Sequence, residues 1–409
     1  MTVALKATTD FIADKPVWVI IVVPLLGLAL AALVLQGLGR SESTSGGTGA
    51  THAFRTFPRG AVRADITGDV VASAGHEERF PWRLAPIRTL AIYATVGLGN
   101  PMGTEAPAAY IGVALGAWLG DRGRRWRQIL RPAALGAGAA GVAALMGQPL
   151  MGAAFMLELG RRHGAPLTDR RLIAALMGGA VGWGINLVLG LDLIRLIVPK
   201  EPPADLAQAL KTAIFIGALS GAITSLAGSA IYYAKKWQAS PVVRLAFGGV
   251  ALAGTAAALV SVASPAAAIG PGGGAIIWAE TSGALPPALL AVALLRAAAT
   301  TAAVAAGGCG GVFVPFLAIG DISGRVFAPS LGVGDDLAGT AGAAGGIAGG
   351  YRLPITAATM ALGIGGPRLA TLTCLGTVVI ASVAGAGAAI MVDRMTKLPF
   401  LWRRAPSHG

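Results

Sequence analysis

The chain has 409 residues, of which 55% are hydrophobic and only 12% are charged. Soluble domains carry about 25% charged residues, so this composition excludes a soluble enzyme, a disordered chain and a secreted disulfide scaffold. The two cysteines and four histidines show no metal-site or disulfide spacing. We therefore interpret the chain as an integral, polytopic membrane protein, not an enzyme, and expect neither a metal nor a cofactor.

The net charge of +13 comes largely from arginines in short loops between apolar runs. Such loops lie on the cytoplasmic side of membrane proteins, so the charge does not indicate nucleic-acid binding. We place three of these loops, at residues 121–131, 161–171 and 235–236, in the cytoplasm. The pattern predicts a multi-pass protein of the bacterial inner membrane with both termini in the cytoplasm.

In chain order, residues 1–40 are predicted to form an N-terminal helix and a first span. The cleanest apolar run, Val17 to Leu38, is long enough to cross a bilayer. Residues 41–86 form a polar loop that is too long for a tight turn. The rest is divided into a first repeat (87–236), a second repeat (237–395) and a short cytoplasmic tail (396–409) without a regulatory domain. We treat residues 1–409 as one transmembrane domain.

Several apolar runs are interrupted. Residues 132–160 are broken by Gly147 and Pro149, which predicts two short helices that enter the membrane and return. Arg171 to Val198 and Lys211 to Tyr233 are predicted to cross it. Broken helices persist in a membrane only where protein or a water-filled cavity covers their freed backbone groups, and they are typical of transporters and channels with a site near mid-membrane.

Two segments of the chain repeat each other. Gly103–Pro107 aligns with Gly311–Pro315 at an offset of 208 residues, and Pro149 aligns with Pro354 at an offset of 205. Two ordered blocks at nearly one offset indicate a duplication, and duplicated membrane halves usually meet at a transport site. Basic loops follow the first copy but not the second, which favours an inverted orientation of the two repeats.

Each copy reads Gly-x-x-x-Pro at the start of an apolar helix. Glycine allows close backbone approach, and proline suits the first turn of a helix. The free N–H groups and the positive dipole end of such a turn attract anions. Two of these turns directed at one point would bind an anion without a buried cation. The predicted anion-binding residues are Gly103, Thr104, Ala106, Val312, Phe313 and Val314.

Glu105 lies inside the first of these turns. An acidic residue at membrane depth is costly and indicates function. Its carboxylate is predicted to occupy the anion site as a tethered competitor, so that protonation or displacement frees the site. The alternative is a first-turn glutamate that merely favours the helix dipole by about 0.3–1 kcal/mol. The matching residue of the second copy is Phe313, so the duplicated fold does not require an acid here.

At these residues the sequence resembles the CLC family of chloride channels and proton-coupled anion exchangers, over about Gly46 to Val392. Gly103–Pro107 is similar to the family's gating motif, and the segment around Phe313 to its G-G-x-F-x-P motif. Gly47-Thr-Gly49 resembles its filter turn, with Thr48 at the filter serine. The resemblance implies an all-α fold of two inverted-topology repeats of broken and tilted helices, a homodimer with one pore per subunit, and a bound chloride or other halide.

The sequence also departs from the family pattern. Thr104 replaces a basic residue, and Leu159 stands where the exchangers carry their inner proton-transfer glutamate. Its neighbour Glu158 is the candidate inner proton relay, or else a local ion-pair partner of the arginines that follow it. No tyrosine follows Tyr351, so the family's late tyrosine is missing. These departures predict a wider inner vestibule and weak or absent proton coupling.

Two further charged residues have structural interpretations. Glu280 follows a glycine-rich run and is predicted to lie in a partly wet loop. Arg296 lies in an apolar helix and either holds loop carbonyls or adds positive potential near the pore.

The function expected from the sequence is passage of chloride or a similar monovalent anion through a pore gated by Glu105. One alternative is a proton-coupled exchanger of chloride or fluoride, and another is a broken-helix carrier for a different small solute. A membrane enzyme or scaffold has little support, because we find no nucleophile–base pair. The expected partners are a small inorganic anion, protons in the exchanger case, membrane lipid and a second copy of the chain.

Overall fold

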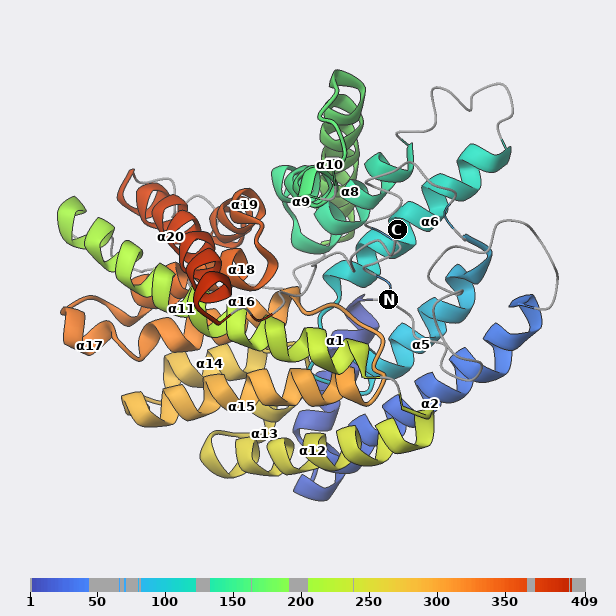
Figure 1. The fold of residues 1–409 in the computed structure, drawn as a ribbon, viewed down its shortest axis with the longest axis horizontal. Helices are drawn as coiled ribbons and strands as arrows, with labels where there is room; N and C mark the ends of the chain where they lie inside the picture. The colour runs from blue at the N-terminus through green and yellow to red at the C-terminus, as the bar shows by residue number, and fades with distance from the viewer. Residues whose placement is uncertain are drawn as a thin grey trace.

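The fold comes from a computed structural model that describes residues 2–43, 66, 70, 80, 82–122, 133–162, 164–190, 205–237, 239–365, 372–396 and 398. Across these residues the regular structure is helical, apart from one isolated β-bridge between Gly103 and Gly311 (Figure 1). The predicted filter residue Thr48 lies outside the described residues.

The helices fall into four consecutive groups. The N-terminal group is α1 (Thr2–Ala13), α2 (Val17–Ser43), the short 3-10 helix η1 (Trp82–Leu84) and α5 (Ala85–Gly97). The first broken-helix group is α6 (Glu105–Arg122), α8 (Ala133–Met146), α9 (Pro149–Arg162) and α10 (Asp169–Leu189). The central group is α11 (Leu206–Lys236), α12 (Pro241–Val262), α13 (Pro265–Ala268), α14 (Gly273–Thr281) and α15 (Pro286–Ala305). The second broken-helix group is α16 (Phe313–Arg325), α17 (Ala328–Leu331), α18 (Asp335–Tyr351), α19 (Pro354–Gly365) and α20 (Leu372–Thr396).

Six helices in the described part of the chain are long and apolar enough to cross a bilayer: α2, α10, α11, α12, α15 and α20. The predicted first span is confirmed, because α2 begins at Val17. The predicted break is confirmed as well, since α8 ends at Met146 and α9 begins at Pro149. Gly147 between them has a φ of +66°, a conformation that glycine adopts without strain. At 14 residues each, α8 and α9 are too short to span a membrane.

The two broken-helix groups pack in the same way. In the first, α8 packs on α6, α9 and α10; in the second, α18 packs on α16, α19 and α20. A Cβ on Gly112 would overlap the carbonyl oxygen of Ala137, and a Cβ on Gly320 would overlap that of Gly342. These contacts correspond at the offsets of the sequence repeat, since 320 − 112 = 208 and 342 − 137 = 205. The duplication is therefore confirmed by backbone packing at equivalent glycines.

The two copies meet at equivalent residues. Gly103 N donates to Gly311 O at 2.6 Å, and Gly311 N donates to Gly103 O at 2.8 Å. The pairing is antiparallel, so a local twofold axis passes between the two glycines. This is the junction expected of inverted repeats.

Candidate anion site

The glycine junction brings two helix starts together. Glu105 is the first residue of α6 and Phe313 is the first residue of α16, each two residues after its junction glycine. The first backbone bonds of these helices are donated by the amides of Ala108 and Phe316. Amides before those positions have no acceptor within their own helix. Val312, which precedes α16, provides no side-chain cap, so backbone N–H groups from both copies remain available at this point.

The Glu105 carboxylate occupies this convergence point. The residue is 0% exposed, and a Cβ on Gly311 would lie 3.2 Å from Glu105 Oε2. The backbone N–H groups of Thr104 and Val314 are close to the carboxylate. No hydrogen bond of normal geometry reaches either carboxylate oxygen in the part of the chain that the structure describes. A buried acid without strong partners is costly.

The predicted backbone ligands surround the same point. Ala106, Val312, Phe313 and Val314 are all buried, and Gly103 forms the junction itself. The structure thus brings together the predicted anion-binding residues that it describes. Whether an anion binds there stays a prediction. Among the described residues, no group of three His, Cys, Asp or Glu side chains is placed to hold a metal ion.

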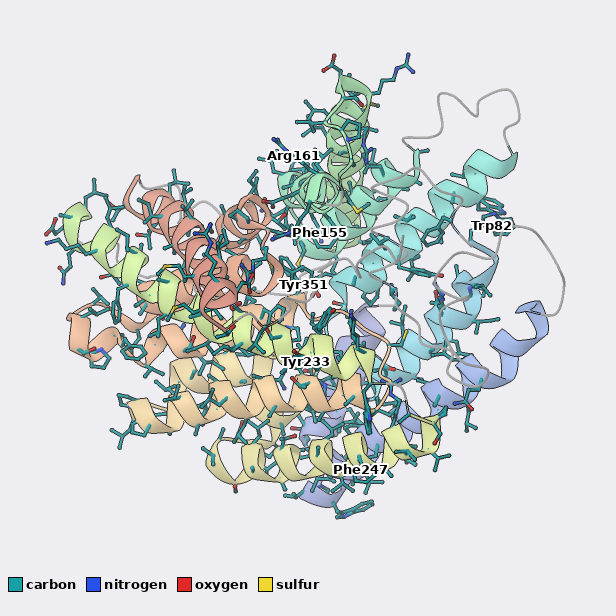
Figure 2. The ribbon with its side chains drawn as sticks, in the orientation of Figure 1. Trp82, Phe155, Arg161, Tyr233, Phe247 and Tyr351 are labelled. Atoms are coloured by element: carbon teal, nitrogen blue, oxygen red, sulfur yellow. The ribbon has the colours of Figure 1, made fainter. Side chains whose placement is uncertain are left out.

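An aromatic cluster lies beside the site. The Phe313 ring contacts Phe155 of α9 at 5.9 Å between centroids and Tyr351 of α18 at 5.1 Å. Phe316 adds a contact with Tyr351 at 5.7 Å. Phe155 and Tyr351 are labelled near the centre of Figure 2. The sequence analysis found the family's late tyrosine missing and gave Tyr351 itself no role, but Tyr351 reaches Phe313 from the end of α18. The sequence signal that could have placed Tyr351 near the site is its position three residues before Pro354, the proline that aligns with Pro149 in the repeat.

The carboxylate of Glu158 caps a helix of the other repeat. It accepts hydrogen bonds from Ile355 N at 3.1 Å, Thr356 N at 2.8 Å and Thr356 Oγ1 at 2.7 Å. These groups belong to the first turn of α19, where an acid is favourable. One turn later on α9, Arg162 donates to the carbonyl of Tyr351 at 3.2 Å. The C-terminal end of α9 therefore forms hydrogen bonds with both the end of α18 and the start of α19.

The prediction for Glu280 was wrong. Glu280 lies in α14, not in a wet loop, and its side chain is only 4% exposed. Arg325 is the reason, because it pairs with Glu280 at 3.0 Å, Asp321 at 2.7 Å and Asp336 at 3.4 Å. A buried carboxylate is tolerated when a cation and hydrogen bonds compensate its charge.

Arg296 holds loop carbonyls, which was one of its two predicted roles. The side chain is fully buried and donates to Gly270 O at 2.7 Å and Ala267 O at 3.4 Å. Gly270 N in turn donates to Gly99 O at 2.8 Å, and Thr300 donates to Pro101 O at 3.1 Å. Arg296 and Thr300 lie one turn apart on α15. This helix therefore supports the segment that leads into Gly103.

A duplicated bundle of broken membrane helices, with a buried carboxylate where two helix starts converge, defines a membrane transport protein for small anions. The family model described as voltage gated chloride channel matches residues 46–387. The chain belongs to this family, the CLC anion transport proteins.

Several relatives share this family. The chain is 27% identical over 324 residues to the "H(+)/Cl(-) exchange transporter ClcA" of Vibrio parahaemolyticus. The alignment covers 74% of this chain and 68% of that protein. The protein of the same name from Vibrio vulnificus is 26% identical over the same shares.

Solved structures show the same fold. A slow cyanobacterial Cl⁻/H⁺ antiporter superposes with a TM-score of 0.68 at 19% identity, over 96% of this chain and 93% of that one. A CLC-type fluoride/proton antiporter superposes with a TM-score of 0.62 at 19% identity, over 90% of this chain and 94% of the other.

Proposed function

We propose that the protein passes chloride or a similar small monovalent anion across the membrane through the Gly103–Gly311 junction, with Glu105 as the gate and with weak or absent proton coupling. The observation that carries this proposal is the position of the Glu105 carboxylate, fully buried where the backbone amides of both repeats converge. An anion at this point would compete with the carboxylate for the same N–H groups.

The gate works by removing a competing charge. Protonation makes Glu105 neutral, and displacement moves its charge away; either change leaves the amides near Thr104 and Val314 free to bind an anion. Backbone dipoles attract the ion without a permanent cation at the binding point, which keeps binding weak enough for the ion to leave. Thr48 would add a hydroxyl in this scheme.

Two residues on α9 support weak proton coupling. Leu159, at the position of the family's inner proton-transfer glutamate, is fully buried and apolar. The neighbouring Glu158 uses its carboxylate to accept three hydrogen bonds at the start of α19. A proton relay through Glu158 would have to break this cap.

The second candidate is a proton-coupled anion exchanger for chloride or fluoride. The names of the Vibrio relatives and of the structural neighbours favour it. As further parts of the proposal, the protein acts as a homodimer in a bacterial inner membrane, with both termini in the cytoplasm.

Simultaneous anion and proton flux in proteoliposomes tests both candidates. Purified protein is reconstituted with a chloride or a fluoride gradient, and a potassium ionophore carries the compensating charge. We expect anion efflux with little accompanying proton movement, in wild type and in a Glu158→Gln variant. Proton uptake in a fixed ratio to anion efflux would refute the uncoupled proposal and establish the exchanger. No flux of either anion would refute both.

A further inference from the structure

A long apolar groove lies on the outer surface of the central helix group. It has a volume of about 620 Å³ and is formed by α11, α12 and α15; α15 packs on both of the other helices and runs between them in Figure 1. Its walls include Leu226 of α11, Phe247 of α12, and Leu294 and Ala298 of α15. These side chains are exposed, and all three helices are long enough to span a bilayer. The groove therefore lies on an exposed apolar surface at the depth of the membrane-spanning helices.

One end of the groove carries aromatic rings and lysines. Trp237, which directly follows α11, lines the groove and packs edge-to-face on Phe247 at 6.3 Å. Lys235 and Lys236 immediately precede Trp237, and Lys236 Nζ lies 4.5 Å from the Tyr232 ring centroid. Figure 2 labels Tyr233 on α11 and Phe247 on α12. Tryptophan, tyrosine and lysine together are typical of the level of lipid headgroups.

The charge of the groove helices has one sign. α11, α12 and α15 contain five charged side chains, and all are cationic: Lys211, Lys235, Lys236, Arg244 and Arg296. Arg296 is buried against loop carbonyls, and Arg244 donates to the carbonyls of Val304 and Ala305. Lys235, which is partly exposed, and Lys236, which is exposed, directly precede Trp237 at one end of the groove. Paired lysines near a membrane surface attract anionic headgroups.

The groove shares a helix with the anion site. Leu294, Ala298 and Thr301 of α15 line the groove. Arg296 and Thr300 of the same helix hold the backbone that leads into Gly103. A molecule packed in the groove thus presses on the helix whose other face supports the site.

We propose that this groove binds an anionic phospholipid, with an acyl chain between α12 and α15 and the phosphate at Lys235 and Lys236, and that the bound lipid steadies α15 behind the anion site. The binding site goes beyond the transport function, because native mass spectrometry measures binding without transport. The effect on α15 rests on the proposed function, because its readout is anion flux.

Native mass spectrometry of the detergent-solubilised protein tests binding, with phosphatidylglycerol and phosphatidylcholine of identical acyl chains as probes. We expect phosphatidylglycerol to be retained preferentially. A Lys235→Gln/Lys236→Gln variant should lose about 30-fold in affinity for it, at about fivefold for each lysine. Lys211→Gln, which removes a charge at the other end of α11, is the matched control and should bind like wild type. Ala298→Trp fills the groove from an exposed position and should reduce binding of both lipids.

A second measurement tests the link to α15. In vesicles with increasing phosphatidylglycerol content, wild-type anion flux should rise, and flux through the double lysine variant should not. Equal retention of the two lipids, or unchanged retention by the double variant, would overturn the binding site. Loss of subunit association in Ala298→Trp would also overturn it, because a second copy of the chain would then occupy the groove. Identical lipid dependence of flux in wild type and variant would overturn the effect on α15.

Discussion

Replacing Glu105 by glutamine tests the gate directly. The substitution keeps the shape of a side chain that is 0% exposed and removes its charge. Two like charges about 4 Å apart at an effective dielectric constant of about 20 repel by about 4 kcal/mol. Since the carboxylate and an anion would share the same backbone amides, the neutral variant should bind chloride about a thousandfold more readily than the ionised wild type.

The assay is anion flux and chloride binding as a function of pH. Lowering the pH protonates Glu105 and removes the competing charge, so wild-type flux should rise as the pH falls. Flux through Glu105→Gln should be high and independent of pH. The chloride affinity of this variant, measured by calorimetry, should also be the same at every pH. Glu158→Gln is the control, because it alters a partly buried acid at another place and should keep the wild-type pH response. A Glu105→Gln variant that retains the wild-type pH dependence would refute the gate.

Three stability predictions follow from other contacts and are measured by thermal unfolding in detergent. Glu158→Ala removes the cap of α19 and should cost about 1–3 kcal/mol, while leaving the pH response of flux in place; an unchanged melting temperature would contradict the capping role. Arg325→Met leaves the buried carboxylates of Asp321 and Glu280 without a cation and should cost about 3–5 kcal/mol, and a stable variant would show that the pairing is dispensable. Gly320→Val forces a branched side chain against the α18 backbone and should cost more than Gly334→Val, where a Cβ meets open space.

The sequence was most informative where its signals are local. Hydropathy predicted the start of α2 at Val17, and Gly147 with Pro149 predicted the break between α8 and α9, because backbone conformation depends on those residues themselves. The repeat offset correctly predicted that Gly103 and Gly311 form equivalent parts of the fold. It also predicted which helix starts would converge.

Contacts between distant segments were not predictable in the same way. Glu158 caps a helix start that is 197 residues away, and Arg325 removes the need for water around Glu280. Tyr351 reaches Phe313 only because α18 packs on α16. Each of these contacts depends on how whole helices pack against one another, and the local residue pattern of a single sequence does not specify that packing.

The reciprocal Gly103–Gly311 hydrogen bonds have an evolutionary consequence. Main-chain atoms alone form that joint, so the side chains two positions downstream were free to diverge after the gene segment doubled. One repeat has the ionisable side chain of Glu105 at this position and the other has the phenyl ring of Phe313, while the glycine hydrogen bonds between them are reciprocal. The two repeats therefore share the same backbone joint but place different chemistry beside it, a carboxylate on one side and an aromatic ring on the other.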